Sequence, residues 1–352
     1  MSRHSEVMSE HPEAASALHG RHVWVRVEAD DGTWGLGRTA FGRPVQVLVD
    51  EVFATLITGT DVFATELHND VMWRASLRAG DAGHTAFARG AIDLALWDLK
   101  GKLLGAPVYA LIGGPVRPTV PCYATADDLD WSMELGFESY KISNEVHHDD
   151  GAAGLDRAED KVASARRTVG QSADLMYNPV MPFTVEYAVR MAERLRPYRL
   201  RWLEEPLAPW DDDGMRRLRQ RIPHQPLATG EDHHGRHAFR RLVESRSVDV
   251  LQPDIEWCGG FTEALRVATI AEAAGLEVVP HVGANTPWGQ HFAMAVTNAP
   301  LAEYWLGGDP GVPLGELDRI PGSAIPDRGR LTASSSPGFG LEISDEWVRP
   351  LT

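Results

Sequence analysis

Polar side chains occur at regular intervals at the ends of short apolar runs between residues 178 and 281. Asn178, Glu204, Glu231, Asp254 and His281 each end such a run, and consecutive members are 23 to 27 residues apart. That interval is the length of one strand followed by one helix. If the runs are parallel strands of one sheet, their ends meet at one edge, so we expect these side chains to surround one opening.

Three of these residues carry oxygen atoms that suit a metal ion. Asn178, Glu204 and Glu231 would come from three neighbouring strands, and hard cations such as Mg²⁺ bind oxygen ligands. A carboxylate at a strand end can also cap a helix or pair with an arginine, but three in consecutive units favour a metal site. The two cysteines, Cys122 and Cys258, belong to no Cys/His cluster, which argues against zinc.

Asp254 and His281 end the next two runs, across from the carboxylates. A carboxylate beside an imidazole orients the ring and raises its basicity, the usual arrangement of a general base. Lys141 ends an earlier run, where it could act as a base or as an anchor for an anion. The residues therefore predict proton transfer beside a metal ion.

The elements that must position these residues form an α/β pattern from about residue 118 onward. Amphipathic segments of helical periodicity, such as 156–170, 185–197 and 261–275, lie between the apolar runs. Strands alternating with helices imply a parallel sheet, and eight strands imply a closed barrel. The runs are 119–125, 137–143, 173–178, 200–204, 226–231, 248–254, 276–281 and 302–306.

The first part of the chain has a different pattern. Residues 22–39 alternate around an Asp-Gly turn, which predicts an antiparallel hairpin. Residues 45–57 and 88–104 have helical spacing of apolar side chains. This part is therefore a mixed α+β unit.

We divide the chain into three parts on this basis. Residues 1–115 form the α+β domain, residues 116–315 the barrel, and residues 316–352, rich in Pro, Gly and Ser, a segment that packs back on the first domain.

Composition and charge limit the classes of function. With 352 residues, 43% hydrophobic and 24% charged, the chain is typical of a globular protein. It has no run of roughly 18 apolar residues and no apolar core of a secretory signal. Two cysteines exclude a disulfide framework, so we expect a cytoplasmic protein. The net charge of −16 argues against nucleic acid but permits an anionic substrate in a locally positive pocket.

Five ordered motifs resemble those of the enolase superfamily, specifically its mandelate racemase subgroup. They are ARGAIDLALWDLKGKLLGAPVYALIGG, WLEEPL, ATGEDHHG, LQPDIEWCGG and VVPH. The forms GEDHHG, QPDIEWCGG and PHVGANT are most similar to L-rhamnonate dehydratases and related acid-sugar dehydratases. The resemblance implies an N-terminal α+β capping domain that covers a modified TIM barrel of the (β/α)7β type.

The resemblance also implies a chemistry, which is abstraction of the proton α to a carboxylate with Mg²⁺ stabilising the enediolate. By position, Glu204 and Glu231 match the metal ligands, and Asp254 and His281 match the catalytic His-Asp dyad. Alternation alone does not decide between Glu204 and Glu205. The resemblance favours Glu204 as the ligand, with Glu205 pointing away and paired.

The sequence departs from the family pattern in three places. Asn178 stands where an aspartate ligand is usual, so we expect weaker Mg²⁺ binding or a site completed by substrate. Ser143 replaces the second lysine of the racemase Lys-x-Lys motif. Near the eighth strand only Glu303 could supply the usual acidic group, and its register is shifted. We expect the substrate to contact Ser143, His233, Trp257, Glu303 and Arg21.

The predicted function is a dehydratase of a sugar acid, in which His281 removes the α-proton and the β-hydroxyl leaves to give a 2-keto-3-deoxy acid. A racemase or epimerase is an alternative and requires Lys141 to act as a base on the opposite face. A catalytically weakened relative with a binding or structural role is a third, suggested by Asn178. We expect a small-molecule carboxylate as substrate, no nucleic-acid or membrane partner, and self-association.

Overall fold

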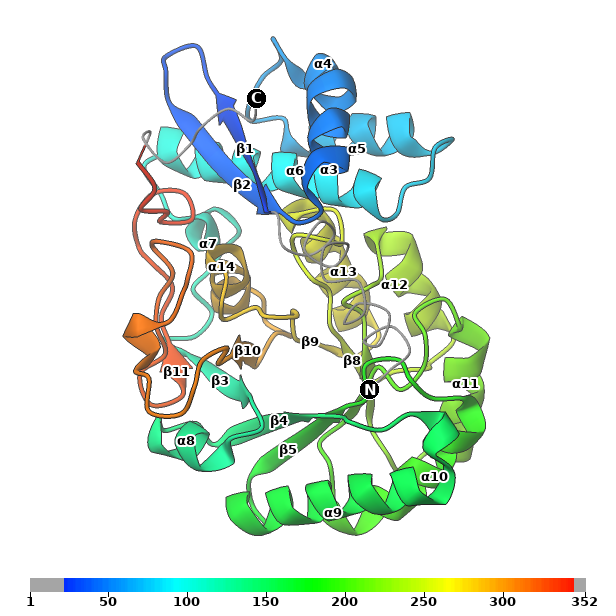
Figure 1. The fold of residues 1–352 in the computed structure, drawn as a ribbon. Coiled ribbons are helices and arrows are strands. Elements are labelled where there is room, and N and C mark those ends of the chain that lie inside the picture. The colour runs from blue at the N-terminus through cyan, green and yellow to red at the C-terminus, as the bar shows by residue number, and fades with distance from the viewer. Residues whose placement is uncertain (1–21, 345–352) are drawn as a thin grey trace.

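The computed structural model describes residues 22–344, so Arg21, predicted to contact the substrate, lies outside the described residues. Figure 1 shows a small unit of a hairpin and helices, blue to cyan, above a larger ring of strands and helices, green to orange. The predicted fold, a parallel (β/α) barrel with an N-terminal α+β domain, is confirmed.

The N-terminal unit begins with the hairpin predicted over residues 22–39. Its strands, β1 (Val23–Glu28) and β2 (Trp34–Thr39), pair antiparallel. The helices that follow are α3 (Gly42–Val47), a π-helical turn η1 (Leu48–Phe53), α4 (Ala54–Ile57), α5 (Thr65–Ser76) and α6 (His84–Leu103).

Helix α6 lies between the hairpin and the barrel, and nearly all of its side chains are buried. Gly37 on β2 allows the strand to approach the helix backbone, because a Cβ at this position would lie 2.0 Å from the Ala91 carbonyl oxygen. On the barrel side, the Trp97 indole N–H donates to Thr262 Oγ1 at 2.9 Å. The helix therefore belongs to the interface of the two units.

The barrel strands run parallel in the order β10-β3-β4-β5-β6-β7-β8-β9. Within residues 22–344 no ladder joins β9 to β10, since the chain after β9 reaches Pro280, which has no N–H to donate. The seam is bridged instead by the Ala284 N–H, which donates to the Glu303 carbonyl oxygen at 2.7 Å. The strands are β3 (Val120–Thr125), β4 (Ser139–Ser143), β5 (Asp174–Asn178), β6 (Leu203–Glu204), β7 (Leu227–Thr229), β8 (Val250–Leu251), β9 (Glu277–Val278) and β10 (Ala302–Trp305).

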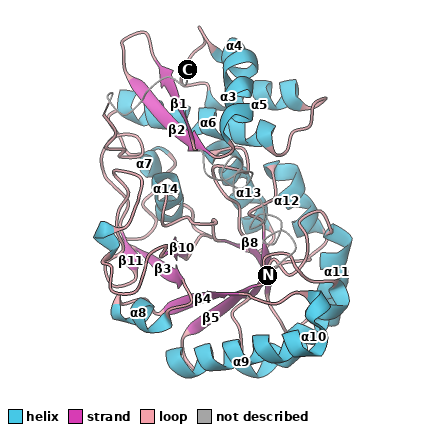
Figure 2. Cartoon of the chain, in the orientation of Figure 1, coloured by secondary structure: helices cyan, strands magenta, loops and turns pink. Residues whose placement is uncertain are grey.

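Helices lie outside the ring of strands, as the cyan ribbons in Figure 2 show. No helix within residues 22–344 is long and apolar enough to cross a membrane. The helices are α7 (Val108–Leu111), α8 (Leu129–Glu134), α9 (Gly151–Val169), α10 (Val185–Leu195), α11 (Asp212–Arg221), α12 (Gly235–Glu244), α13 (Phe261–Ala273) and α14 (Pro287–Ala295).

The barrel interior explains which polar residues reach the opening. Strand side chains alternate between two faces, so a residue two positions beyond an interior side chain also points inward. Glu204 follows the interior Trp202 by two positions. The same step leads from Met176 to Asn178. It also leads from Val279 to His281, from Leu301 to Glu303 and from Val250 to Gln252.

The described part of the C-terminal segment contacts both units. Strand β11 (Arg330–Leu331) pairs antiparallel with β3. Further along, Gly338 forms a bridge with Pro107, and the Phe339 N–H donates to Asp98 Oδ1 on α6 at 2.9 Å.

Candidate active site

A cavity of about 500 Å³ opens at the carboxyl ends of the barrel strands. Glu231, His281 and Lys141, which lie far apart in the sequence, meet in its wall. The predicted residues that line it are Lys141, Ser143, Asn178, Glu231, His281 and Glu303.

Asp254 and His281 form a hydrogen-bonded pair. The Asp254 Oδ2 lies 2.9 Å from the His281 Nδ1, and since a carboxylate only accepts, Nδ1 is the protonated ring nitrogen. Asp254 Oδ1 accepts the backbone N–H groups of Glu256 at 2.8 Å and Trp257 at 3.1 Å. Both oxygens of Asp254 are therefore fixed, and the His281 Nε2 faces Glu231 Oε2 at 3.8 Å.

The charges around His281 favour its protonated form. Burial alone would lower the pKa of this imidazole, but Glu231, Asp254 and Glu303 raise the pKa well above its ordinary value. A positive charge placed beside Glu231 acts in the opposite direction, so cation binding and the basicity of His281 are linked.

Lys141 is buried between two carboxylates. Its Nζ forms ion pairs with Glu204 Oε1 and, at 2.7 Å, with Glu303 Oε1. Burial would lower the pKa of Lys141, but Glu204 and Glu303 raise the pKa well above its ordinary value. The side chain is therefore an ammonium, which suits an anion anchor better than a base.

Glu204 accepts four donors in the barrel interior. Oε1 contacts Lys141 and accepts the Asn178 amide N–H at 2.8 Å, and Oε2 accepts the Trp202 indole N–H at 2.8 Å and the Gln252 amide N–H at 2.7 Å. The structure thus places Glu204 and Asn178 side by side, with both engaged by protein groups.

Glu205 differs from its neighbour. The prediction that it points away and is paired is wrong: it is 1% exposed, and neither carboxylate oxygen has a hydrogen-bond partner in the described chain. Its ligand atoms lie within 4.8 Å of those of Glu231 and Asp232. The reason is the backbone, because Glu205 has a φ of 42° and leaves the strand, so alternation no longer applies.

This carboxylate cluster is electrostatically unfavourable by itself. Burial, followed by the charges of Glu231 and Asp232, raises the pKa of Glu205 well above its ordinary value. Burial also raises the pKa of Glu231, to about 7, against the opposing effect of His281. Buried carboxylates with unpartnered oxygens are the donor set that hard divalent cations bind, so the residues present fit Mg²⁺.

Glu303 is an ionised partner of Lys141. Its Oε1 accepts the Thr125 hydroxyl at 2.6 Å, and its Oε2 accepts the Val282 N–H at 2.9 Å. Burial would raise the pKa of Glu303, but Lys141 and His281 lower it to about 2. At neutral pH this group holds charge in place and has no proton to donate.

The other residues predicted to contact the substrate differ in how close they lie to the cavity. Ser143 is exposed at the cavity and donates to Asp127 Oδ2 at 2.5 Å. The Trp257 ring lies 5.3 Å from the His281 ring, centroid to centroid. His233 is buried and does not line the cavity.

Reasoning from sequence alone missed Trp202, Gln252 and Asp232. The first two stand two positions before Glu204 and Asp254, so strand alternation was a signal that could have found them. Asp232 directly follows Glu231.

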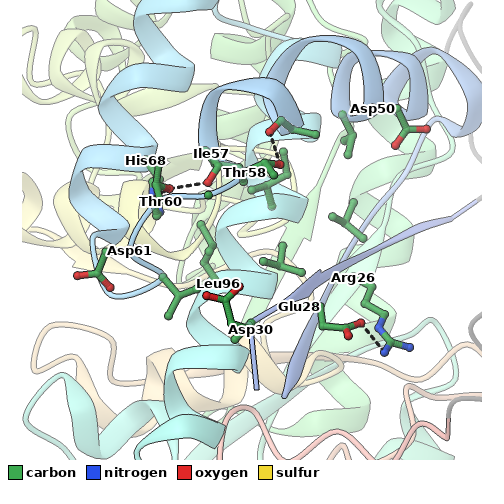
Figure 3. A pocket seen from close by; sticks show the side chains of 18 of the residues that line it. Arg26, Glu28, Asp30, Asp50, Ile57, Thr58, Thr60, Asp61, His68 and Leu96 are labelled. Atoms are coloured by element: carbon green, nitrogen blue, oxygen red, sulfur yellow. Dashed lines mark hydrogen bonds and ion pairs between the residues drawn. The ribbon is translucent and has the colours of Figure 1, made fainter. Parts of the chain in front are cut away.

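A larger cavity, of about 980 Å³, lies in the N-terminal unit along β1 and the turn after α4 (Figure 3). Ile57 and Leu96 contribute apolar surface, and the His68 Nε2 lies 2.8 Å from Thr60 Oγ1. None of the predicted catalytic or metal residues lines it, so we place the chemistry in the smaller cavity despite the difference in size.

Two family models match the chain. The model described as "Mandelate racemase / muconate lactonizing enzyme, N-terminal domain" matches residues 5–113. The model described as "Enolase C-terminal domain-like" matches residues 125–347.

Individual relatives agree with these matches. An L-rhamnonate dehydratase of Saccharopolyspora erythraea is 38% identical over 92% of this chain and 83% of its own length. The crystal structure of rhamnonate dehydratase from Gibberella zeae complexed with Mg is 34% identical, covers 96% of this chain and 83% of that one, and has a TM-score of 0.90. A racemase from Streptomyces coelicolor A3(2) with bound magnesium is 29% identical, covers 92% and 90%, and has a TM-score of 0.82.

Proposed function

The chain belongs to the mandelate racemase and muconate lactonizing enzyme group of the enolase superfamily, and from that premise we propose that it is a Mg²⁺-dependent dehydratase of a sugar acid. The observation that carries the proposal is the His281–Asp254 pair, which faces buried carboxylates in one cavity. The relatives named L-rhamnonate dehydratase, one of them complexed with Mg, support the substrate class and the cation.

Glu204, Glu231 and Asn178 are the proposed metal ligands, an assignment that follows the family resemblance. Glu204 is paired with Lys141 in this structure, so it would exchange that contact for the ion, and Glu205 adds negative charge beside them. When bound, Mg²⁺ supplies positive charge that stabilises the charge developing on the substrate carboxylate. The Lys141 ammonium anchors the same carboxylate from the β4 side. Asn178 contributes no charge, which lowers the affinity relative to an aspartate at this position.

His281 performs the proton transfers. Its Nε2, directed into the cavity because Nδ1 is bound to Asp254, takes the proton from the carbon α to the carboxylate. The β carbon–oxygen bond then breaks, and the hydroxyl leaves as water with a proton returned from Nε2. The resulting enol tautomerises to a 2-keto-3-deoxy acid.

A racemase would need a second base opposite His281. Lys141 is the candidate, and in this structure it is engaged in ion pairs with Glu204 and Glu303. We favour dehydration over epimerisation because the relatives of 38% and 34% identity are named rhamnonate dehydratases.

The proposal is tested by incubating the protein and Mg²⁺ with a panel of acid sugars that includes L-rhamnonate. Formation of a 2-keto acid from at least one substrate, lost with EDTA and restored with Mg²⁺, is expected. An epimer without a carbonyl product would support a racemase instead. No turnover across the panel, together with no Mg²⁺ binding by calorimetry, would support a non-catalytic role.

A further inference from the structure

One arginine of the N-terminal unit contacts the turn that carries the catalytic aspartate. Arg38, near the end of β2, donates from Nε at 3.0 Å and from Nη2 at 2.8 Å to Glu256 Oε1. Its guanidinium lies 5.9 Å from the Trp24 ring and 5.7 Å from the Trp288 ring. Arg38 therefore connects the N-terminal unit, which covers the barrel, to the barrel itself, and it lies between two aromatic side chains.

Glu256 in turn holds Asp254. Its backbone N–H donates to Asp254 Oδ1 at 2.8 Å, while the other oxygen of Asp254 binds His281 Nδ1. The same turn is braced from α6, where a Cβ on Gly90 would lie 2.6 Å from the Glu256 carbonyl oxygen. The residue whose side chain binds Arg38 is therefore the one whose backbone N–H fixes the catalytic carboxylate.

The arrangement depends on the positive charge of Arg38. Glu256 is 5% exposed and lies near the carboxylate of Asp254. Burial raises the pKa of Glu256 to about 7, while Arg38 opposes the shift and Asp254 adds to it. Without Arg38, the buried Glu256 carboxylate would be left unpaired beside that of Asp254. Their repulsion would then be reduced by protonation of Glu256 or by movement of the turn.

We propose that Arg38 is a positioning residue for the reaction: through Glu256 it fixes Asp254, and thereby the orientation of the His281 imidazole. The effect of Arg38 on the reaction rests on the proposed function. The contacts from Arg38 through Glu256 and Asp254 to His281 do not depend on it. Neither Arg38 nor Glu256 lines the catalytic cavity, and the proposed metal ligands and Lys141 stand on other strands. The N-terminal unit thus helps to position the group that transfers the proton, in addition to covering the cavity.

Kinetics separate this role from general stabilisation. In Arg38→Gln we expect kcat to fall about 10- to 100-fold, the range for a misplaced catalytic group, with KM and Mg²⁺ affinity changed less than twofold. The isotope effect on kcat with α-deuterated substrate should rise, because proton abstraction becomes slower. Partial unfolding would instead lower the active fraction and leave the isotope effect unchanged.

Three further variants sharpen the comparison. Arg38→Lys keeps the charge and should recover part of kcat. The double variant Arg38→Gln with Glu256→Gln removes the unpaired carboxylate, so its kcat should exceed that of Arg38→Gln alone. The matched control is Arg26→Gln on β1. It removes an arginine that pairs at 2.7 Å with Glu28 of the same strand, and it should keep the activity of the starting protein.

A second readout does not depend on turnover. In protein labelled with ¹⁵N-histidine, the His281 Nδ1 proton bound to Asp254 should give a downfield NMR signal, assigned by its loss in His281→Asn. This signal should shift or broaden in Arg38→Gln and persist in Arg26→Gln.

The outcomes distinguish the two proposals. If no acid sugar is turned over but the signal depends on Arg38, the proposed function fails and the positioning role stands. If the protein is active, and Arg38→Gln changes neither kcat, the isotope effect nor the NMR signal, the positioning role is refuted.

Discussion

Glu204 and Glu205 are adjacent in the sequence but differ in their surroundings. Glu204 accepts four donors, whereas Glu205 is buried with unpartnered oxygens beside Glu231. The sequence did not decide by alternation which of the two points inward, and only the family resemblance favoured Glu204. The structure supplies the missing reference, because the interior Trp202 stands two positions before Glu204. The position of Glu205 could not be predicted, because it follows from a backbone angle that the sequence does not reveal.

Calorimetric titration with Mg²⁺ distinguishes the roles of these carboxylates. Glu231→Gln and Glu204→Gln should each weaken Mg²⁺ binding at least tenfold, because each removes a proposed charged ligand. Glu205→Gln should weaken it by less than tenfold, since it removes only a nearby charge. The opposite ranking of Glu204→Gln and Glu205→Gln would show that Glu205 is the ligand and Glu204 is not.

Among the elements, the hairpin and the barrel strands could be predicted because their apolar spacing is local information. The open seam between β9 and β10 and the π-helical turn η1 could not, since both depend on contacts with distant parts of the chain. The spacing of apolar residues also does not reveal that β2 packs closely on α6, although the β2 glycines that permit this packing can be read from the sequence.

Gly37→Ala tests that packing. The new Cβ would lie 2.0 Å from a backbone oxygen of α6, so strand and helix must separate, and we expect a loss of about 1–3 kcal/mol in unfolding free energy. Urea denaturation measures the change. Gly315→Ala is the control, because its Cβ would meet only Ile325 at 3.8 Å. Equal stability of both variants would contradict the account of this interface.

On the scale of the whole molecule, three separate parts of the chain meet at His291. This residue on α14 is fully buried, its Nδ1 accepts the Tyr109 N–H at 3.2 Å, and its ring lies 5.4 Å from the Phe339 ring. Contacts of this kind join the barrel, the segment after α6 and the C-terminal segment. The boundaries that we predict at residues 115 and 315 remain predictions.

Acid stability reports on this junction. Burial lowers the pKa of His291 to about 3, whereas in the unfolded chain the group titrates near its ordinary value of 6.5. As the pH falls, the unfolded chain therefore binds this proton before the folded protein does. The contribution of neutral His291 to folding stability is complete above pH 6.5 and is lost as the pH falls toward 3.

His291→Gln removes this titration and can still accept the Tyr109 N–H. Between pH 7.5 and 5.0, urea denaturation should show that the original protein loses about 1–2 kcal/mol more than the variant. Parallel pH profiles for the two proteins would rule out this contribution.

The central claim, that His281 removes the α-proton, is tested most directly by substrate turnover in D₂O with Mg²⁺. The original protein should form keto acid. If the recovered substrate contains deuterium, it should be bound to the α carbon and to no other carbon. His281→Asn should abolish both product and exchange while it still binds Mg²⁺. Turnover of His281→Asn at the original rate would contradict the account.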